Sequence, residues 1–440
     1  MMINNFLLEK IVLPLGDLIL KSSFTKMLNF WRGFDSFSEL DLIRYQEKQL
    51  KTQLLYAQKY ISKYKGIKID LNKKANEIIK SFPILTKDDL RSNPQSLQIN
   101  KNQNVSKIYS SGSTGLSTWV SMDKPDLISI QSLSIHLWEL CGYKLGNPIL
   151  QTGISPKRSR LKKLKDLFFG VYYVSAFTLN KDDLKKICSR LLRNEKYTLV
   201  GYPSSLNIIA EYIIEKNINL KLKAVIGLGD KLFDHYKNNI QQAFGCKIHE
   251  TYGSSEGFQI GFQADLDYMY LFSPQVFLEV LDHKNNPVKE GEIGNVVVTR
   301  LDNKHMPLIR YKLGDLVVML PKEKYPPNRK FNFPLIEKVI GRNTDVVILP
   351  DNRKLIVHSF TGIFEYIPEI KQFKIIQKNR KGITVQYVLD ESFTKEVLTI
   401  VKVKLQKIIM NDDFKILFEE VSIIKGTKSG KPQIIESYIV

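Results

Sequence analysis

One short loop of the sequence gathers side chains that can contact a nucleotide. Residues 250–257 read ETYGSSEG and follow an apolar, strand-like run that ends at Ile248. The Tyr252 ring could lie against a base, the two serine hydroxyls could contact a phosphate, and the Glu256 carboxylate could hold Mg²⁺. The same residues could equally form a structural turn, so the loop needs support from elsewhere in the chain.

A second loop rich in glycine and hydroxyl groups lies earlier. Residues 109–115 read YSSGSTG and stand between two β-like runs, residues 105–108 and 118–122. We therefore expect a hairpin. The loop lacks the Gly-Lys-Ser/Thr ending of a Walker loop and the glycine spacing of a dinucleotide fingerprint. Its amides and hydroxyls could wrap polyphosphate oxygens, or the hairpin could be purely structural.

Three later segments place charged groups next to glycine. Asp315 follows Gly314 at a strand-like run, where it could accept hydrogen bonds from both ribose hydroxyls or simply sit in a turn. Arg342 belongs to a GRNTD segment at a proposed domain junction, and Lys431 ends a GTKSGK segment near residue 440. That lysine could reach a distant site, although a solvated lysine is the plainer interpretation.

The composition describes a globular protein of at least two domains. The chain has 440 residues, 43% of them apolar and 10% aromatic. Its cysteines form no metal-ligand spacing and no disulfide framework, which fits a reducing compartment: Cys141, Cys188 and Cys246. The opening residues do not resemble a signal peptide, and the apolar run at 11–20 is too short to span a bilayer. We therefore expect a cytoplasmic protein.

The net charge of +20 leaves the partner open. Residues 157–165 read KRSRLKKLK and could meet an anionic membrane surface, an acidic carrier protein or a polyphosphate, or form a solvated face. Peripheral association with the inner membrane face is one consequence to test. The sequence has no recognisable nucleic-acid-binding module, so we do not expect a nucleic-acid partner.

Periodicity predicts an α/β fold with a large layered N-terminal part and a smaller α+β C-terminal part. The first 75 residues have helical spacing, and Thr86 with Asp89 predicts a capping box. From 124 to 260, helical stretches alternate with short apolar runs, which predicts a largely parallel sheet. Residues 270–320 are β-like. We place the boundary so that residues 1–340 and 341–440 form separate domains.

Taken in chain order, these five segments resemble the motifs of the adenylate-forming (ANL) superfamily. Within it, the chain resembles the phenylacetate–CoA ligase-like branch and CapK-type proteins of capsular polysaccharide biosynthesis. Supporting stretches are LPLGD at 13–17, FPILTKDDLR at 82–91, GYPSSL at 201–206 and the long run 225–257. The resemblance covers nearly the whole chain and implies an adenylation domain followed by a mobile C-terminal lid.

The resemblance assigns a nucleotide-binding role to each matching position. The hairpin loop would clasp the β- and γ-phosphates of ATP through Ser110, Ser111, Gly112, Ser113, Thr114 and Gly115. Tyr252, followed by Gly253, would stack on adenine, and Ser255 would touch the α-phosphate. Gly229 and Asp230 would line the adenine pocket.

The remaining roles concern the metal, the ribose and the catalytic step. Glu256 would hold Mg²⁺ and Asp315 would bind the ribose. Arg342 would lie near the ribose and phosphate, and Lys431 would be the catalytic lysine of the lid. Two departures bear on efficiency: Leu116 and Ser117 stand where many members have Pro-Lys, and residue 344 is a threonine where a charged hinge residue is common.

The implied activity is ATP-dependent activation of a small carboxylic acid. An acyl-adenylate would form with release of pyrophosphate, and the acyl group would pass to CoA, an acyl carrier protein or an amino sugar. ATP and Mg²⁺ are the implied cofactors, with CoA as a further ligand. Two alternatives stay open: a synthetase that acylates its own cysteine, and a non-catalytic basic scaffold at a membrane surface. We interpret His136 as a packing residue and His249 as a support for the 250–257 loop.

Overall fold

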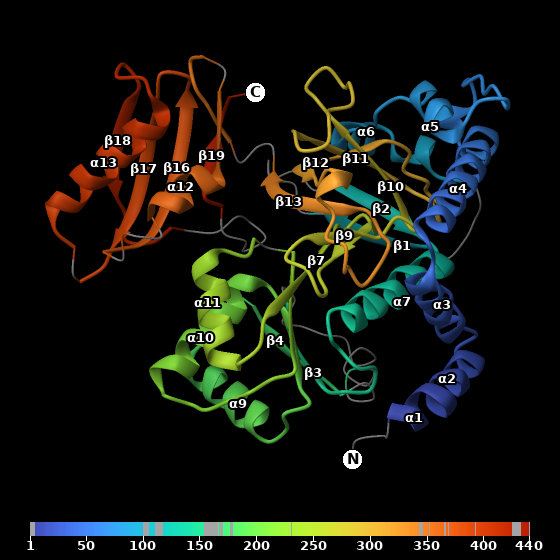
Figure 1. Ribbon diagram of the computed structural model, residues 1–440, viewed down its shortest axis with the longest axis horizontal. Coiled ribbons are helices and arrows are strands. Elements are labelled where there is room, and N and C mark those ends of the chain that lie inside the picture. The colour runs from blue at the N-terminus through green and yellow to red at the C-terminus, as the bar shows by residue number, and fades with distance from the viewer. Residues whose placement is uncertain are drawn as a thin grey trace. The chain divides into compact units, whose positions relative to one another are not determined.

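The computed structural model describes most of the chain in two compact units (Figure 1). Described are residues 5–99, 105–110, 118–153, 166, 170–176, 179–229, 231–342, 346–351, 353–364, 367, 369–391, 393–424 and 433–439. The large unit comprises residues 1–313 and 319–338, and the small unit comprises 314–318 and 339–440. The division therefore falls inside strand β13, between Lys338 and Val339.

The N-terminal segment is helical, as its periodicity predicted. Its helices are α1 (Asn5–Leu7), the π-helical turn η1 (Leu8–Val12), α2 (Leu13–Ile19), α3 (Phe24–Arg32), α4 (Glu39–Tyr60) and α5 (Ala75–Ile78), with 3₁₀ turns at Gly33–Ser36, Ser62–Tyr64 and Ile79–Ser81. The predicted capping box is present at α6 (Lys87–Ser92), where the Thr86 and Asp89 side chains each accept from the other residue's backbone amide. The turn Pro94–Leu97 follows.

The middle of the large unit is a parallel sheet of alternating strands and helices, which confirms the predicted α/β class. The chain passes through α7 (Lys124–Leu140), β3 (Ile149–Gly153), β4 (Val171–Ser175), α9 (Lys181–Leu192), β5 (Thr198–Gly201), α10 (Pro203–Glu215), β6 (Ala224–Leu228), α11 (Asp234–Phe244) and β7 (Ile248–Gly253). The order β4-β3-β5-β6-β7 is parallel throughout.

Both faces of this sheet are buried, which explains why its strands are apolar at successive positions. Leu199 and Val225 belong to the core under α9, α10 and α11, the green helices of Figure 1. Their neighbours Val200 and Ile226 belong to a core on the other face, shared with α7 and α3. Adjacent residues of a strand point to opposite faces, so each strand contributes to both cores.

Antiparallel strands extend the sheet on the far side of β7. They are β8 (Gln259–Phe262), β9 (Met269–Leu271), β10 (Val276–Leu281), β11 (Ile293–Arg300), β12 (Tyr311–Met319) and β13 (Leu335–Arg342). The whole sheet has the order β10-β11-β12-β13-β9-β8-β7-β6-β5-β3-β4. Strands β10, β11 and β12 fall within residues 270–320, which the sequence predicted to be β-like.

The small unit is α+β, as predicted. It contains β14 (Val346–Ile348), β15 (Lys354–Ile356), α12 (Val357–Phe364), β16 (Ile370–Asn379), β17 (Gly382–Leu389), α13 (Lys395–Ile409), β18 (Lys415–Glu420) and β19 (Ile435–Ser437). Its main sheet has the order β18-β17-β16-β19. Helix α13 buries one stripe at helical spacing: Val397, Val401, Leu405 and Ile409.

Candidate functional site

The ETYGSSEG segment is half strand and half turn. Strand β7 pairs with β6 on one side and β8 on the other, so the chain stays extended to Gly253. The turn then closes through two backbone bonds, Ser254 N to Phe258 O at 2.9 Å and Gly257 N to Ser254 O at 3.1 Å. The predicted loop at 250–253 is therefore wrong, because two neighbouring strands hold those residues in the sheet. Tyr252 projects from β7 itself.

Gly257 fits its position only as glycine. Its φ is +93°, and a Cβ there would lie 2.7 Å from Ile130 Cδ1, 2.8 Å from Met122 Cε and 3.0 Å from Arg300 Nη1. Helix α7, strand β2 (Thr118–Met122) and strand β11 thus close around the turn that follows Glu256. These side chains pack closely against the turn and so fix the position of the neighbouring Glu256 carboxylate.

Glu256 is a buried carboxylate with a defined orientation. The Tyr311 hydroxyl donates to Glu256 Oε1 at 3.2 Å, and Ser255 Oγ lies 3.4 Å from Oε2. The Tyr311 ring stacks on Phe258, with centroids 6.0 Å apart and planes 7° apart. Tyr311 was missed by the sequence reasoning, which used the segment 310–315 only for Asp315. Nothing local indicates that its hydroxyl reaches a residue 55 positions away.

The carboxyl ends of the parallel strands bring several polar groups to one edge of the sheet. Thr152 Oγ1 and Ser205 Oγ are 2.7 Å apart, and the Tyr202 amide donates to Thr152 Oγ1 at 3.2 Å. Gly229 follows β6 with φ +69°, and Thr251 of β7 lies beside Gly227. Ligands of open α/β sheets bind at this edge. The edge therefore carries Gly229 and the ETYGSSEG segment together.

The predicted hairpin is present. Strands β1 (Ser106–Ser110) and β2 (Thr118–Met122) are antiparallel, and the last pair is Ser110 with Thr118. The loop between them, with Ser111, Gly112, Ser113, Thr114 and Gly115, lies outside the described residues, as do Asp230 and Lys431. Asp315 lies within β12, half-buried, after Gly314 with φ +92°, and Arg342 ends β13. Their nucleotide roles stay predictions.

A buried ionic cluster supports the turn from behind. Arg300 is fully buried and binds Asp302 with both Nε at 2.7 Å and Nη2 at 3.0 Å. Arg300 Nη2 lies 3.8 Å from Asp126 of α7. Burial raises the pKa of Asp126 to about 7, against the opposing effect of Arg300 and with reinforcement from Asp123 and Asp302. No sequence signal marked this cluster, because its members lie on separate elements.

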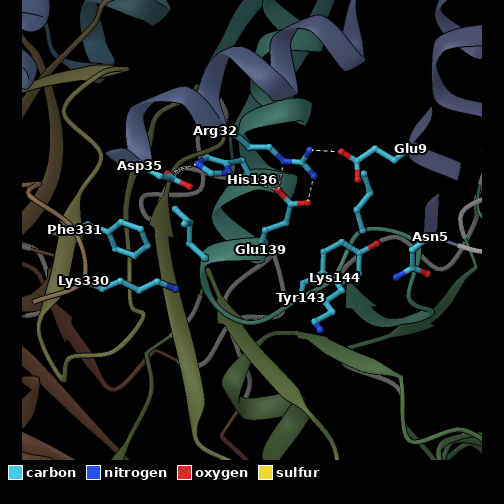
Figure 2. Close-up of a pocket in the computed structure, with 12 residues that line it drawn as sticks. Asn5, Glu9, Arg32, Asp35, His136, Glu139, Tyr143, Lys144, Lys330 and Phe331 are labelled. Carbon is cyan, nitrogen blue, oxygen red and sulfur yellow. Dashed lines mark hydrogen bonds and ion pairs between the residues drawn. The ribbon is translucent and has the colours of Figure 1, made fainter. Parts of the chain in front are cut away.

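An open pocket of about 590 Å³ lies at the other end of α7 (Figure 2). Arg32 reaches between Glu9 at 2.6 Å and Glu139, and His136 Nε2 lies 3.0 Å from Asp35. Burial alone would lower the pKa of His136, but hydrogen bonds to Asp35 and Glu139 raise it. Lys144, which also lines the pocket, precedes β3, so the pocket lies at the amino ends of the strands and not at the carboxyl-end edge that carries the ETYGSSEG segment.

The buried histidine and cysteine groups are poorly suited to chemistry at that edge. His136 packs and pairs inside the large unit, as the sequence predicted. Burial, followed by nearby Lys247, lowers the pKa of His249. Burial raises the pKa of Cys141, and it raises those of Cys188 and Cys246 to about 11. Thiols of high pKa are weak nucleophiles near neutral pH, which disfavours self-acylation.

Comparisons with known proteins agree with this geometry. No family model matches the chain. The protein CapK of Staphylococcus aureus is 26% identical over 255 residues, and the match spans 55% of this chain and 56% of that relative. The structure of 2-hydroxyisobutyryl-CoA ligase, in the postadenylation state in complex with R3-HIB-AMP, is 16% identical with a TM-score of 0.69, covering 89% of this chain and 88% of that one.

A third similarity is to the amide bond synthetase McbA of Marinactinospora thermotolerans, at 13% identity and a TM-score of 0.55, over 74% of this chain and 67% of that one. The fold is therefore that of the adenylate-forming ligases, as the order of the sequence motifs implied. The chain is similar to CapK over about half the length of each protein.

Proposed function

We propose that this chain is an ATP-dependent carboxylate ligase that forms an acyl-adenylate and then transfers the acyl group. The observation that carries the proposal is the orientation of Glu256. This buried carboxylate is fixed by Tyr311 and by the close-packed turn at Gly257, beside the carboxyl ends of the parallel strands. The fold shared with acyl-adenylate-forming ligases supports the same reaction.

The residues present fit a magnesium ion. Mg²⁺ is usually bound by one or two carboxylates together with substrate phosphates and water, so a single oriented carboxylate is an adequate protein ligand. Each Glu256 oxygen accepts from one hydroxyl, Oε1 from Tyr311 and Oε2 from Ser255, and Glu256 would hold the ion through a further lone pair of these oxygens. When bound there, the ion would supply neutralisation of the phosphate charge.

The chain's own groups would position ATP for in-line attack. Tyr252 would stack on adenine, Asp315 would accept from the ribose hydroxyls, and the loop between β1 and β2 would wrap the β- and γ-phosphates. The substrate carboxylate would then attack the α-phosphorus as pyrophosphate leaves. Such catalysis consists mostly of positioning and charge stabilisation, which the packed turn and strand ends can supply.

Lys431 would complete the site from the small unit by bridging the carboxylate and the α-phosphate. After adenylation, rotation of the lid formed by residues 341–440 would withdraw this lysine and admit the acceptor. Arg342 would take part near the ribose and phosphate at the junction. The acceptor would be a thiol of CoA or of an acyl carrier protein, or the amine of a sugar.

The similarity to CapK supports a role in surface polysaccharide biosynthesis. An ATP-dependent ligase with three unpaired cysteines also fits the reducing cytoplasm. The panel of acids tested below identifies the substrate class.

Pyrophosphate release tests the proposal directly. The full chain would be assayed with ATP and Mg²⁺ against panels of aryl, acyl, amino and sugar acids, beside Lys431→Ala and Glu256→Gln. We expect release with one acid class and a loss of about 100-fold or more in each variant. ATP affinity, measured by calorimetry, separates binding from chemistry.

The outcomes are distinct. Acid-dependent release that collapses in both variants supports adenylation and names the substrate class. Release that persists in Lys431→Ala contradicts the assigned lysine. If the chain neither binds ATP nor releases pyrophosphate with any acid, the ligase proposal is wrong and a scaffold role becomes the better interpretation.

A further inference from the structure

The first helix of the chain is continuous and contains one π-helical turn between two α-helical stretches. Elements α1, η1 and α2 join without a break from Asn5 to Ile19, because Leu7 and Val12 at the junctions keep right-handed helical angles. The π-helical turn at Leu8–Val12 adds one residue, so Leu8 and Leu13, five residues apart, both face inward. Val12 is half-buried against the same core, and the other apolar side chains of the helix are on the outer surface.

That outer surface is strongly apolar. Leu7, Ile11, Leu15 and Ile19 recur at four-residue intervals, the spacing of one helix face, and all are exposed. At the end of the helix, three consecutive side chains protrude, with exposed fractions of 76% for Leu18, 77% for Ile19 and 67% for Leu20. A contiguous apolar face of this kind marks a surface for a partner or a membrane.

The apolar tip is held in a fixed conformation. Asp17 accepts from the backbone amides of Phe24 at 3.0 Å and Thr25 at 2.8 Å, which closes the turn into α3. Lys124 of α7 donates to the carbonyls of Leu20 at 2.7 Å and Lys21 at 2.9 Å. The three leucine and isoleucine side chains are therefore presented by folded structure and not by a frayed end.

The charges beside this face are positive. Exposed lysines stand on the helix at Lys10, directly after it at Lys21 and near the start of α3 at Lys26, within a chain of net charge +20. The acids of the same helix are half-buried and hydrogen-bonded, Glu9 to Arg32 at 2.6 Å and Asp17 to the turn amides. A partner that buries the apolar side chains would therefore meet a positive rim, and the complementary partner is anionic.

We propose that the outer face of residues 5–20 docks on an anionic lipid bilayer, with the helix lying in the interface. Within the described part of the chain, no helix is long and apolar enough to cross a membrane, so the contact is with one surface. A second copy would bring the same three lysines against each other across a twofold axis. A protein groove would cover one stripe, whereas Leu18, Ile19 and Leu20 protrude on different sides of the helix.

Vesicle co-sedimentation of the full chain tests this surface. The vesicles would contain phosphatidylcholine alone or with about one-third phosphatidylglycerol. The test variant is Ile11→Gln/Leu15→Gln/Leu18→Gln, which leaves Leu8 and Leu13 intact. The matched control, Ile400→Gln/Val403→Gln/Leu417→Gln, removes comparably exposed apolar side chains from the small unit. Circular dichroism and thermal melting check that both variants fold.

We expect binding to anionic vesicles that weakens at least about tenfold in the test variant and is unchanged in the control. Lys10→Glu/Lys21→Glu/Lys26→Glu should weaken it by about 100-fold or more, at about fivefold for each lysine, and high salt should abolish the binding. Unchanged binding in the folded test variant, equal binding to neutral vesicles, or no binding at all would each overturn the proposal. So would a dimer that the test variant abolishes. None of these readouts depends on ligase activity.

Discussion

Helix α7 has ionic side chains at both ends, and the surroundings of the two ends differ. At its first turn, buried Asp126 lies 3.8 Å from the nearest atom of Arg300, whose guanidinium is engaged by Asp302. At its last turn, Glu139 receives Arg32 Nε at 2.8 Å on the wall of an open pocket (Figure 2). The arginine therefore hydrogen-bonds to the acid at the last turn of α7, whereas at the first turn the arginine and the acid are 3.8 Å apart.

The pKa directions follow from this difference. Burial is the largest influence on both acids and would raise both pKa values. At Glu139 the hydrogen bonds from Arg32 and His136 outweigh burial, so its pKa falls below 4.5. At Asp126 burial wins and the pKa rises to about 7. An arginine lowers the pKa of an acid effectively only when the arginine is within hydrogen-bond distance and is not already paired with another carboxylate.

The largest expected change in the free energy of unfolding comes from replacing the buried arginine. Arg300→Met should destabilise the fold by about 3–5 kcal/mol, because it leaves Asp302 and Asp126 without their cation in the interior. Arg32→Met, in the half-exposed network, should cost only about 1 kcal/mol. Urea unfolding of both variants at pH 8 measures the difference, and equal costs would contradict the role assigned to burial.

The second prediction compares the cost of an alanine substitution at two glycines, one near each end of helix α7. Gly257 and Gly146 both have φ +93°, but a Cβ at Gly257 meets Ile130 at 2.7 Å, whereas at Gly146 it meets the flexible Asn5 side chain at 3.0 Å. Gly257→Ala should therefore cost about 2–3 kcal/mol and reduce ATP-dependent activity, and Gly146→Ala about 1 kcal/mol with activity retained. Thermal melting and pyrophosphate release test both.

The third effect is the sign of the pH dependence. Because the folded-state pKa of Asp126 lies above its usual 3.8, the folded chain binds the extra proton between about pH 4 and 7. Its contribution to stability is therefore lost as pH rises through that window. Glu139 has the opposite sign, since its lowered pKa contributes stability above pH 4.5 that is lost on acidification.

Amide variants distinguish the contributions of Asp126 and Glu139 to the pH dependence of stability. Asp126→Asn should flatten the decline between about pH 4 and 7 and stabilise the fold at pH 8 by about 1–2 kcal/mol. Glu139→Gln should destabilise it at the same pH by about 1–2 kcal/mol. Unfolding free energies measured across pH test both variants, and a destabilised Asp126→Asn at pH 8 would show that the attraction of Arg300 for this carboxylate outweighs the cost of its burial.

The smallest effect concerns the orientation of Glu256. Tyr311→Phe removes one hydrogen bond of about 1 kcal/mol, so the Mg²⁺ concentration for half-maximal pyrophosphate release should rise about fivefold. Tyr143→Phe, at the pocket end, removes a 3.5 Å contact to the Asn147 carbonyl and should leave this concentration unchanged. An unchanged Mg²⁺ dependence in Tyr311→Phe would mean that the packed turn alone orients Glu256.

Much of the fold follows from local patterns in the sequence. The period of the apolar residues indicated the parallel sheet and its helices, and the Thr86–Asp89 capping box came from a spacing of three residues. The order of the motifs implied the ligase fold. The exposed N-terminal run was recognised only as too short to span a bilayer, because the sequence does not reveal which side of a π-helical turn packs inward.

What only the tertiary structure decided is which side chains meet. Residues 250–253 looked like a loop and are held extended by strands on both sides. Tyr311 reaches Glu256, and Arg300 lies behind Gly257, from strands that local periodicity places in the sheet but not beside that turn. Helical and strand patterns are set by neighbours a few residues apart, so the sequence determined the elements and the types of their reactive groups. Contacts between residues about 40 to 55 positions apart depend on how the sheet is ordered and packed, and only folding brings them together.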